Sequence, residues 1–328
     1  MVQKLLPENA IEVRNLTKYY DKLLAVDNIN FDVKESELFG FLGPNGAGKT
    51  TTIHILTGIT KPTSGKASIF GFDLTRKAVK AKELIGVVPE ISYLYNEMTA
   101  WDNIIFNAKL HSVPKKKREK LARELLKNFG LYERYKDRVS TFSRGMRKRL
   151  MIITALVHEP KILFLDEPTT GLDVQSSRQI RDMIKELNKN GTTVFLTTHY
   201  IEEADQLCQR IAIIKEGKII KVDTPENLKT ITQAEHIIEV SFDHAKEIGD
   251  ELKRLSHVRD VITAGDKFRL YVEDPSLTLP LIFNFAKNNH LKIISINTIK
   301  PTLEDTFVKL TGLYAKDMNI EKSHVKPI

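Results

Sequence analysis

The chain has 328 residues, of which 41% are hydrophobic and 28% charged, the balance of a soluble globular protein with about two domains. No apolar run approaches the roughly 18 residues that cross a bilayer, and Met1 to Asn9 lack the apolar core of a signal peptide. The single cysteine, Cys208, excludes an internal disulfide framework and a thiol-rich metal site. The net charge of +8 comes from charges of mixed sign, without aromatic interleaving, so we expect a cytoplasmic chain with a buried Cys208 and no nucleic-acid partner.

A glycine-rich loop follows the first strongly apolar segment. Residues Leu38 to Leu42 are apolar, Gly43 to Thr50 fit the pattern G-x-x-x-x-G-K-[ST], and a helix-like stretch comes next. Glycines let the backbone N–H groups of such a loop surround phosphates, because a Cβ would block close approach or the required φ. Lys49 then reaches the β- and γ-phosphate oxygens, and the Thr50 hydroxyl is a ligand for Mg²⁺. The segment therefore predicts a strand, a phosphate loop and a helix that bind a nucleoside triphosphate.

We expect nucleotide contacts along the whole of this loop and into the helix. The residues concerned are Gly43, Pro44, Asn45, Gly46, Ala47, Gly48, Lys49, Thr50 and Thr51. Further along, the basic cluster Lys115 to Lys120 opens a stretch with Leu121, Leu125, Leu126 and Phe129 at helical spacing. This spacing predicts an amphipathic helix with a solvated basic end.

Two further apolar segments each end in polar residues. Lys161 to Leu165 has the pattern of a fully buried strand of a parallel sheet and is followed by Asp166 and Glu167. Thr192 to Thr198 is again apolar and β-branched and is followed by His199. Ligands bind at the carboxyl edge of such sheets, so we expect Asp166 to hold Mg²⁺, Glu167 to orient or deprotonate an attacking water, and His199 to contact the γ-phosphate. Two acids after an apolar run also serve as a helix cap, and the phosphate loop is what favours catalysis.

A second domain follows Thr224. Its alternating strand-like and helix-like segments predict a βαββαβ order and a ferredoxin-like α+β fold. The segments are strands at His236 to Phe242, Val258 to Thr263, Lys267 to Val272 and Leu291 to Ile296, and helices at Ala245 to Leu255 and Leu277 to Asn288. We place the domains at residues 1–224 and 225–312, with a loosely ordered polar tail at 313–328.

The motifs resemble, in identity and order, those of ATP-binding cassette (ABC) proteins. Phe142 to Arg149 is similar to their LSGGQ signature and precedes a helix-like stretch from Leu150 to His158. Over about residues 10–224 the resemblance implies an α/β fold, a P-loop NTPase with a RecA-like core and an α-helical subdomain at about 91–157. It also implies further roles: Tyr20 stacks on adenine above Val26, Glu90 holds the Q-loop position, Asp173 ends the D-loop, and His199 is the switch histidine.

Three passages resemble the ATPase subunits of ABC-2 type exporters, which include drug, sodium and polysaccharide exporters. They are the Met-Arg-Lys-Arg-Leu continuation after Gly145, Thr198 to Asp205, and Pro301 to Phe307. The resemblance implies an ATPase, peripheral on the cytoplasmic face of the membrane, that energises export through a separate permease. For the second domain it implies a regulatory or dimer-stabilising role, and the alternative is a module that only adds stability.

Two residues depart from the family pattern. Glu90 replaces a glutamine that contacts Mg²⁺ and the attacking water, so a carboxylate there is attracted to the metal and repelled by the phosphates. Arg144 replaces the first glycine of the signature and adds a positive charge. Ser143 and Gly145, which contact phosphate in the family, are retained, and we interpret the signature as functional.

The signature lies far along the chain from the phosphate loop. N–H donors at the start of a helix form an anion site that can serve a phosphate held by another subunit. In the family, two ATP molecules lie between the loop of one cassette and the signature of the other. One chain with one loop completes neither site, so we expect a head-to-tail homodimer or a paired second cassette.

Aromatic residues gather between Tyr93 and Trp101, near the Q-loop position. They belong either to the core or, as the resemblance implies, to a groove for a short cytoplasmic helix of the permease. A second class of function is a soluble ABC ATPase that acts on nucleic acid or ribosomes or serves as a clamp. Two features argue against this class. The segment between the phosphate loop and the signature lacks the sustained heptads of a long coiled coil, and the chain has one cassette instead of two in tandem. We therefore prefer the exporter.

Overall fold

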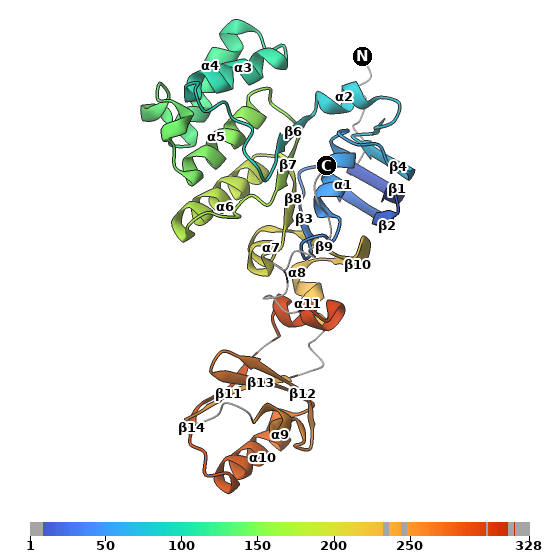
Figure 1. The fold of residues 1–328 in the computed structure, drawn as a ribbon, viewed down its shortest axis with the longest axis vertical. Coiled ribbons are helices and arrows are strands. Elements are labelled where there is room, and N and C mark those ends of the chain that lie inside the picture. The colour runs from blue at the N-terminus through green and yellow to red at the C-terminus, as the bar shows by residue number, and fades with distance from the viewer. Residues whose placement is uncertain (1–8, 232–235, 244–247, 300, 314–317, 319–328) are drawn as a thin grey trace. The chain divides into compact units, whose positions relative to one another are not determined.

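The structure is a computed structural model with two compact units, residues 1–224 with 315–328, and residues 225–314 (Figure 1). The described residues are 9–231, 236–243, 248–299, 301–313 and 318. The predicted loose tail, 313–328, lies outside the described residues except for Leu313 and Met318.

A six-stranded sheet forms the centre of the first unit, in the order β10-β9-β3-β8-β7-β6. All neighbouring strands are parallel except β9 and β10, which are antiparallel. Its strands are β3 (Leu38–Leu42), β6 (Ile85–Val88), β7 (Ile162–Asp166), β8 (Thr193–Thr198), β9 (Arg210–Lys215) and β10 (Lys218–Asp223). Every residue of β3, β7 and β8 is buried, which confirms the prediction of apolar strands covered on both faces.

An antiparallel sheet, β2-β1-β4-β5, accompanies the central sheet. It contains β1 (Asn9–Tyr20), β2 (Leu23–Lys34), β4 (Ser64–Ile69) and β5 (Phe72–Asp73). One apolar core joins residues of both sheets with residues of helix α1 (Lys49–Leu56). Within it, phenylalanine rings pack 5.5–6.0 Å apart between centroids, namely Phe31, Phe39, Phe41, Phe164 and Phe195. The carboxyl ends of β3, β7 and β8 are thereby held side by side.

Most of the remaining helices of the first unit lie on the side of the central sheet away from β1 and β2, whereas α2 (Ala78–Lys82) lies beside β5 and β6 (Figure 1). The others are α3 (Ala100–Leu110), α4 (Lys115–Asn128), α5 (Arg144–Leu156), α6 (Val174–Lys189) and α7 (Ile201–Leu207), with short 3₁₀ turns at Tyr132–Arg134 and Val139–Thr141. The amphipathic helix predicted from the basic cluster is α4, with Ala122 and Leu126 buried. Cys208 is buried, as predicted, and its Sγ would lie 2.5 Å from a Cβ at Gly40.

The second unit carries an antiparallel sheet in the order β12-β13-β11-β14, with the βαββαβ element order predicted from the sequence. Its strands are β11 (His236–Phe242), β12 (Val258–Ala264), β13 (Lys267–Val272) and β14 (Ile293–Ile299), and its helices are α8 (Pro225–Thr230), α9 (Gly249–Lys253), α10 (Pro275–Asn288) and α11 (Leu303–Thr311). The predicted helix from Ala245 to Leu255 is the shorter α9, and residues 245–247 lie outside the described part. Thr302 and Asp305 form a capping box that starts α11.

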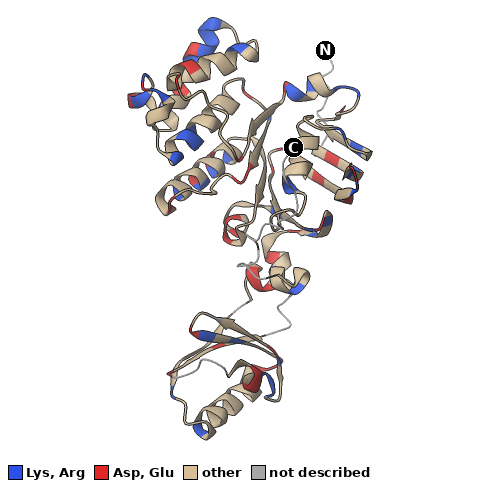
Figure 2. Ribbon diagram, in the orientation of Figure 1, with Lys and Arg blue, Asp and Glu red and all other residues tan. Residues whose placement is uncertain are grey.

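Charged residues of both signs occur in both units (Figure 2). In the described part of the chain, no helix combines the length and apolar character needed to cross a membrane.

Candidate nucleotide and catalytic site

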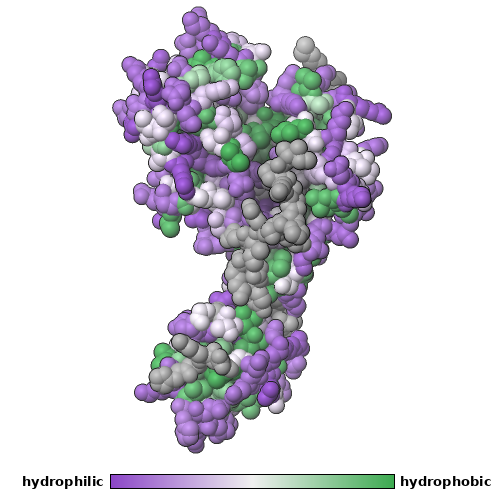
Figure 3. Space-filling model, viewed as in Figure 1, coloured by the Kyte–Doolittle hydropathy of each residue, from purple (hydrophilic) through white to green (hydrophobic). Residues whose placement is uncertain are grey.

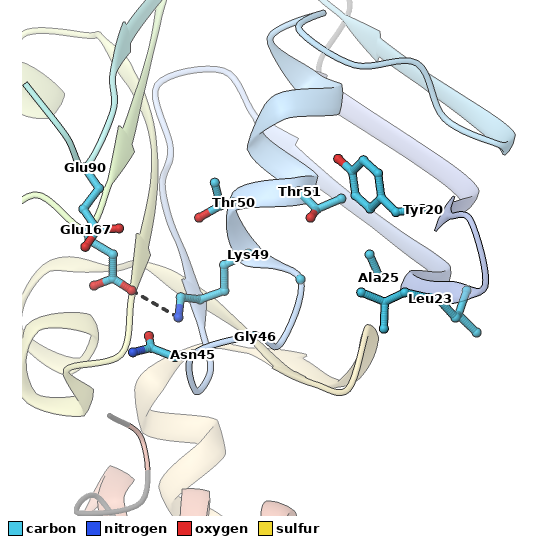
Figure 4. A pocket seen from close by; sticks show the side chains of 12 residues that line it. Tyr20, Leu23, Ala25, Asn45, Gly46, Lys49, Thr50, Thr51, Glu90 and Glu167 are labelled. Carbon is cyan, nitrogen blue, oxygen red and sulfur yellow. Dashed lines mark ion pairs between the residues drawn. The ribbon is translucent and has the colours of Figure 1, made fainter. Parts of the chain in front are cut away.

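A cavity of about 340 Å³ lies in the first unit beside the phosphate loop (Figure 4). Its lining residues are Tyr20, Leu23, Leu24, Ala25, Asn45, Gly46, Gly48, Lys49, Thr50, Thr51, Glu90 and Glu167. They come from the end of β1, the start of β2, the loop after β3, the start of α1 and the segments that follow β6 and β7. The cavity thus brings the predicted loop residues together with residues that follow two other strands.

Two glycines of the loop stand where the neighbouring backbone leaves no space for a side chain. A Cβ on Gly43 would lie 2.3 Å from the Ile214 carbonyl oxygen, and a Cβ on Gly48 would lie 2.5 Å from that of Ala25. Gly48 also has φ +102°, a conformation that favours glycine. It precedes α1 without a side-chain cap, so the first N–H groups of the helix face the cavity as an anion site.

One loop donor is already in use. The N–H of Asn45 donates to the carbonyl oxygen of Met318 over 3.0 Å. A phosphate that is to accept a hydrogen bond from this N–H would have to displace that carbonyl.

Lys49 connects the loop to the residues after β7. Its Nζ donates to the carbonyl oxygens of Gly43 (2.7 Å) and Pro44 (3.2 Å) and lies 3.1 Å from Glu167 Oε1. The side chain is buried, and Figure 4 shows it pointing across the cavity toward Glu167. A triphosphate that reaches Lys49 would therefore compete with Glu167 for the ammonium group.

Asp166 ends β7 and lies between two hydroxyl groups. Its two carboxylate oxygens accept from Thr50 Oγ1 (3.0 Å) and from Thr197 Oγ1 of β8 (2.5 Å). Carboxylate and hydroxyl oxygens beside a phosphate loop are suitable ligands for Mg²⁺, which is usually bound by one or two carboxylates together with substrate phosphates and water. Within the described residues, no three acidic, histidine or cysteine side chains converge as in a metal site built from protein alone. A metal here would depend on nucleotide oxygens for the rest of its coordination.

Glu167 adopts a left-handed backbone conformation, with φ +48°, directly after β7. Its N–H lies 3.2 Å from both the carbonyl and the hydroxyl oxygen of Thr197, which holds this uncommon conformation. Its Oε2 lies 2.8 Å from His199 Nδ1 and also accepts from the His199 N–H. Glu167 and His199 thus reach the same point, as the sequence predicts for the ends of β7 and β8.

The ionised form of Glu167 is favoured despite its burial. Burial raises the pKa of this carboxyl, but the hydrogen bond from His199 and the charge of Lys49 together lower it below its ordinary value. A carboxylate that stays ionised accepts a proton from water rather than donating one.

Of the two residues expected beside adenine, Tyr20 lines the cavity and Val26 does not. Tyr20 lies at the end of β1, is 42% exposed and lines the cavity, with Lys18 Nζ 4.8 Å from its ring centroid. Val26 is fully buried in the core and is not a lining residue, whereas Leu23 and Ala25 are. Figure 4 shows Tyr20, Leu23 and Ala25 together on the side of the loop away from Glu167.

The signature residues lie at the start of α5, outside this cavity. Ser143 caps α5 by accepting from the Met146 N–H, and a Cβ on Gly145 would lie 2.5 Å from Ser176 Oγ of α6. Arg144 donates to the carbonyl of Gly171 over 3.3 Å, so the unusual arginine contacts the D-loop position of its own chain. Asp173 caps α6 and accepts from the N–H and hydroxyl of Ser176. The signature and D-loop residues thus contact one another, and they lie apart from the phosphate loop.

Comparisons with known proteins agree with this geometry. A family model of ABC transporters matches residues 26–170, and a model of the C-terminal domain of DrrA1-3-like ATP-binding proteins matches residues 224–311. The linearmycin resistance ATP-binding protein LnrL of Bacillus subtilis is 36% identical over 94% of this chain and 100% of its own length. The chain belongs to the family of ABC transporter ATP-binding proteins.

Other relatives place the whole cassette in the same group. The daunorubicin/doxorubicin resistance ATP-binding protein DrrA of Streptomyces peucetius is 33% identical over 97% of each chain. The Nod factor export ATP-binding protein I of Burkholderia pseudomallei is 34% identical over 92% of this chain and 97% of its own. The cassette MJ0796, solved as a dimer in a post-hydrolysis state with ADP and Pi, has a TM-score of 0.60 and 30% identity, over 65% of this chain and 98% of its own. The predicted P-loop NTPase fold and ATPase activity are confirmed, and the ribosome or nucleic-acid alternative finds no support.

A second cavity of the ABC cassette, about 280 Å³, lies between α3 and α5 on one side and α2 and β6 on the other. It is lined by Thr57, Ile59, Lys82, Ile85, Val87, Tyr93, Asn107, His111, Thr154, Ala155 and His158. Figure 3 shows the first unit notched between these helices and the rest of the cassette. This cavity holds one of the predicted aromatic residues, Tyr93, whose hydroxyl lies 2.7 Å from Thr154 Oγ1.

Several contacts of the cassette were not predicted from the sequence. Thr197 holds both Asp166 and Glu167, and it precedes His199 in a Thr-Thr-His run that marks the end of β8. Lys148 of α5 is buried beside Glu90, and its spacing of three from Gly145 and four from Ile152 was a signal that it lies on the buried face.

Proposed function

We propose that this ATPase powers export through a separate membrane permease of the ABC-2 type. Support comes from relatives named for resistance and export, which match this chain along nearly its whole length, including the second unit. An ATPase subunit of such an exporter lies at the cytoplasmic face of the membrane, where the permease holds it and where ATP is available.

The observation that carries the mechanism is that the nucleotide cavity and the signature are separate in one chain. The lining residues of the cavity, all in the described part of the chain, include neither Ser143 nor Gly145. Both lie at the start of α5, where N–H donors and the helix dipole favour an anion. A second cassette would supply this helix start to the phosphate held by Lys49, and the related MJ0796 cassette was solved as a dimer. Two ATP molecules would then hold two cassettes together head to tail.

The residues that follow β7 and β8 would carry out the hydrolysis of ATP. Lys49 and the N–H groups of the loop would hold the phosphates, and Glu167 would accept a proton from the attacking water. His199, whose Nδ1 lies 2.8 Å from Glu167, would orient this carboxylate and face the γ-phosphate. Thr50, Asp166 and Glu90 would hold Mg²⁺, which neutralises charge on the phosphates. Tyr20 would stack on the adenine ring.

The first test replaces Glu167 by glutamine. Glu167→Gln keeps the shape of the side chain but removes the base, so ATP hydrolysis should fall by about two orders of magnitude or more. Because ATP is no longer consumed, the variant should elute as a dimer in the presence of ATP and as a monomer in its absence. The measurements are phosphate release and size-exclusion chromatography.

Glu83→Gln, an exposed carboxylate after α2, is the matched control and should behave like the parent. Parent-like hydrolysis by Glu167→Gln would refute the role of this residue. A variant that binds ATP without hydrolysing it and stays monomeric would refute the shared site.

A further inference from the structure

A buried cation lies directly beneath the Q-loop position. Lys148, in the second turn of α5, is only 6% exposed. Its Nζ lies 3.5 Å from the carbonyl oxygen of Pro89 and 3.4 Å from that of Glu90. These are long hydrogen bonds, at the limit of the useful range, so they do not explain by themselves why a charge is buried here.

The charges of four carboxylates act on this ammonium group. Burial lowers the pKa of Lys148, and the charges of Glu90, Asp166, Glu167 and Glu203 oppose this effect, with Glu90 the strongest of the four. An apolar side chain of similar length would fill the same space without the cost of burying a charge. The negative charge of these carboxylates is therefore the physical reason for a lysine at this position.

Glu90 is the member of this group that breaks the family pattern. The resemblance to ABC proteins predicts a neutral glutamine at this position, whereas Glu90 adds a negative charge to the cavity proposed to bind a triphosphate. Lys148 contacts the backbone carbonyl of Glu90, and it comes from the helix that the signature residues begin. Lys148, a charge on the buried face of α5, and Glu90, a charge at the Q-loop position, thus lie next to each other.

We propose that Lys148 is a positioning residue that offsets the charge of Glu90 and couples the signature helix to the Q-loop. This inference rests on the role proposed above for Glu90 in the nucleotide site. With Lys148 in place, the carboxylate of Glu90 approaches the metal without weakening phosphate binding.

A double-mutant cycle tests the offset. Lys148→Met should raise the KM for MgATP by about three- to tenfold, because Glu90 then repels the phosphates unopposed. In a Glu90→Gln background the same change should alter KM by less than about twofold, since no charge remains to offset. Lys148→Arg keeps the charge and should stay within about twofold of the parent. Lys185→Met, an exposed lysine of α6, is the matched control.

Lys148→Gln separates charge from hydrogen bonding, because its amide still donates to carbonyls. A KM like that of Lys148→Met supports the proposal, and a parent-like KM overturns it. Equal effects of Lys148→Met in the parent and in the Glu90→Gln background would also overturn it. If the uncharged variants do not fold, recovery of folding by Glu90→Gln supports the offset and no recovery overturns it. A parent-like Glu90→Gln alone would instead refute the role proposed for Glu90, and Glu167→Gln tests the ATPase assignment separately.

Discussion

Two histidines at the second cavity show how burial changes the chemistry of a single residue. The rings of His111 and His158 stack with centroids 3.7 Å apart, and His158 Nε2 lies 3.0 Å from the carbonyl oxygen of Ile85. Burial, and then the neighbouring His111, lower the pKa of His158 to about 4. His158 is therefore neutral in the folded protein at pH values where it is charged in the unfolded chain.

This difference predicts a loss of stability in mild acid. Between about pH 6.5 and 4 the unfolded chain binds the proton and the folded chain does not, so the free energy of unfolding should fall as the pH is lowered through this window. From about pH 7.5 to 5 the loss due to His158 should be on the order of 1 kcal/mol, after allowance for solvent screening. His158→Gln should remove that part of the slope.

Urea unfolding at several pH values measures this effect. The chain has one tryptophan, Trp101, so its fluorescence reports on the first unit alone. Equal slopes for the parent and His158→Gln would show that folding does not change the proton affinity of His158.

Single residues of the site were predictable where the chain order decides their place. Asp166, Glu167 and His199 follow apolar strands, and parallel strands bring such residues to one edge. The left-handed conformation of Glu167 and its ion pair with Lys49 depend on how β7 meets the loop, which no local pattern encodes. The inward position of Val26 has a similar cause, because β1 and β2 shift register at Ala25, between the pairs Lys18–Val26 and Tyr19–Leu24.

At the scale of elements, the packing of α5 against α6 depends on one glycine. A Cβ at Gly145 would lie 2.5 Å from Ser176 Oγ and 2.8 Å from Ser176 Cβ. Gly145→Ala should therefore separate the two helices and cost about 1–3 kcal/mol of stability, as overpacking does. Thermal unfolding measures this loss, and ATP affinity at the phosphate loop should remain close to that of the parent.

Removal of the opposing side chain is the control for Gly145→Ala. Ser176→Gly loses the cap contact with Asp173 and should destabilise the protein by itself. The double variant should nevertheless lose less stability than the two single variants added together, because the clash is gone. Additive losses would mean that α5 and α6 adjust without strain.

Helices and strands could be predicted where the apolar pattern is long. The predicted ends were wrong where tertiary contacts decide where an element begins or ends. The strands β3, β7 and β8 match their apolar runs closely. The strand β14 continues to Ile299, beyond the predicted end at Ile296, because it keeps pairing with β11. The helix α10 starts earlier than predicted because Asp274 caps it, with Pro275 in its first turn. The helix α11 was not predicted, although the spacing of Thr302 and Asp305 is the pattern of a capping box.

At the scale of the whole molecule, the structure separates the aromatic residues between Tyr93 and Trp101 into two groups. The half-buried Trp101 packs against Tyr135, with ring centroids 5.8 Å apart, and against Arg123. The exposed side chain of Tyr95, at 52%, contacts only the edge of Phe106 among the described rings. Trp101 therefore serves the core, whereas Tyr95 is free to serve as an anchor for a partner.

This difference makes Tyr95 the right residue for a test of docking to the permease. The backbone of Tyr95 is fixed by Asn103, which accepts from its N–H (2.9 Å) and donates to its carbonyl (3.1 Å), so a change of side chain leaves these contacts intact. Tyr95→Glu should reduce the fraction of the subunit that sediments with permease-containing membranes by about tenfold, the loss typical of a buried aromatic anchor. Ile220→Glu, an exposed apolar residue of β10, is the control and should sediment like the parent. A folded, ATP-binding Tyr95→Glu that still sediments like the parent would place the docking surface elsewhere, and a parent chain that never associates with membranes would refute the exporter itself.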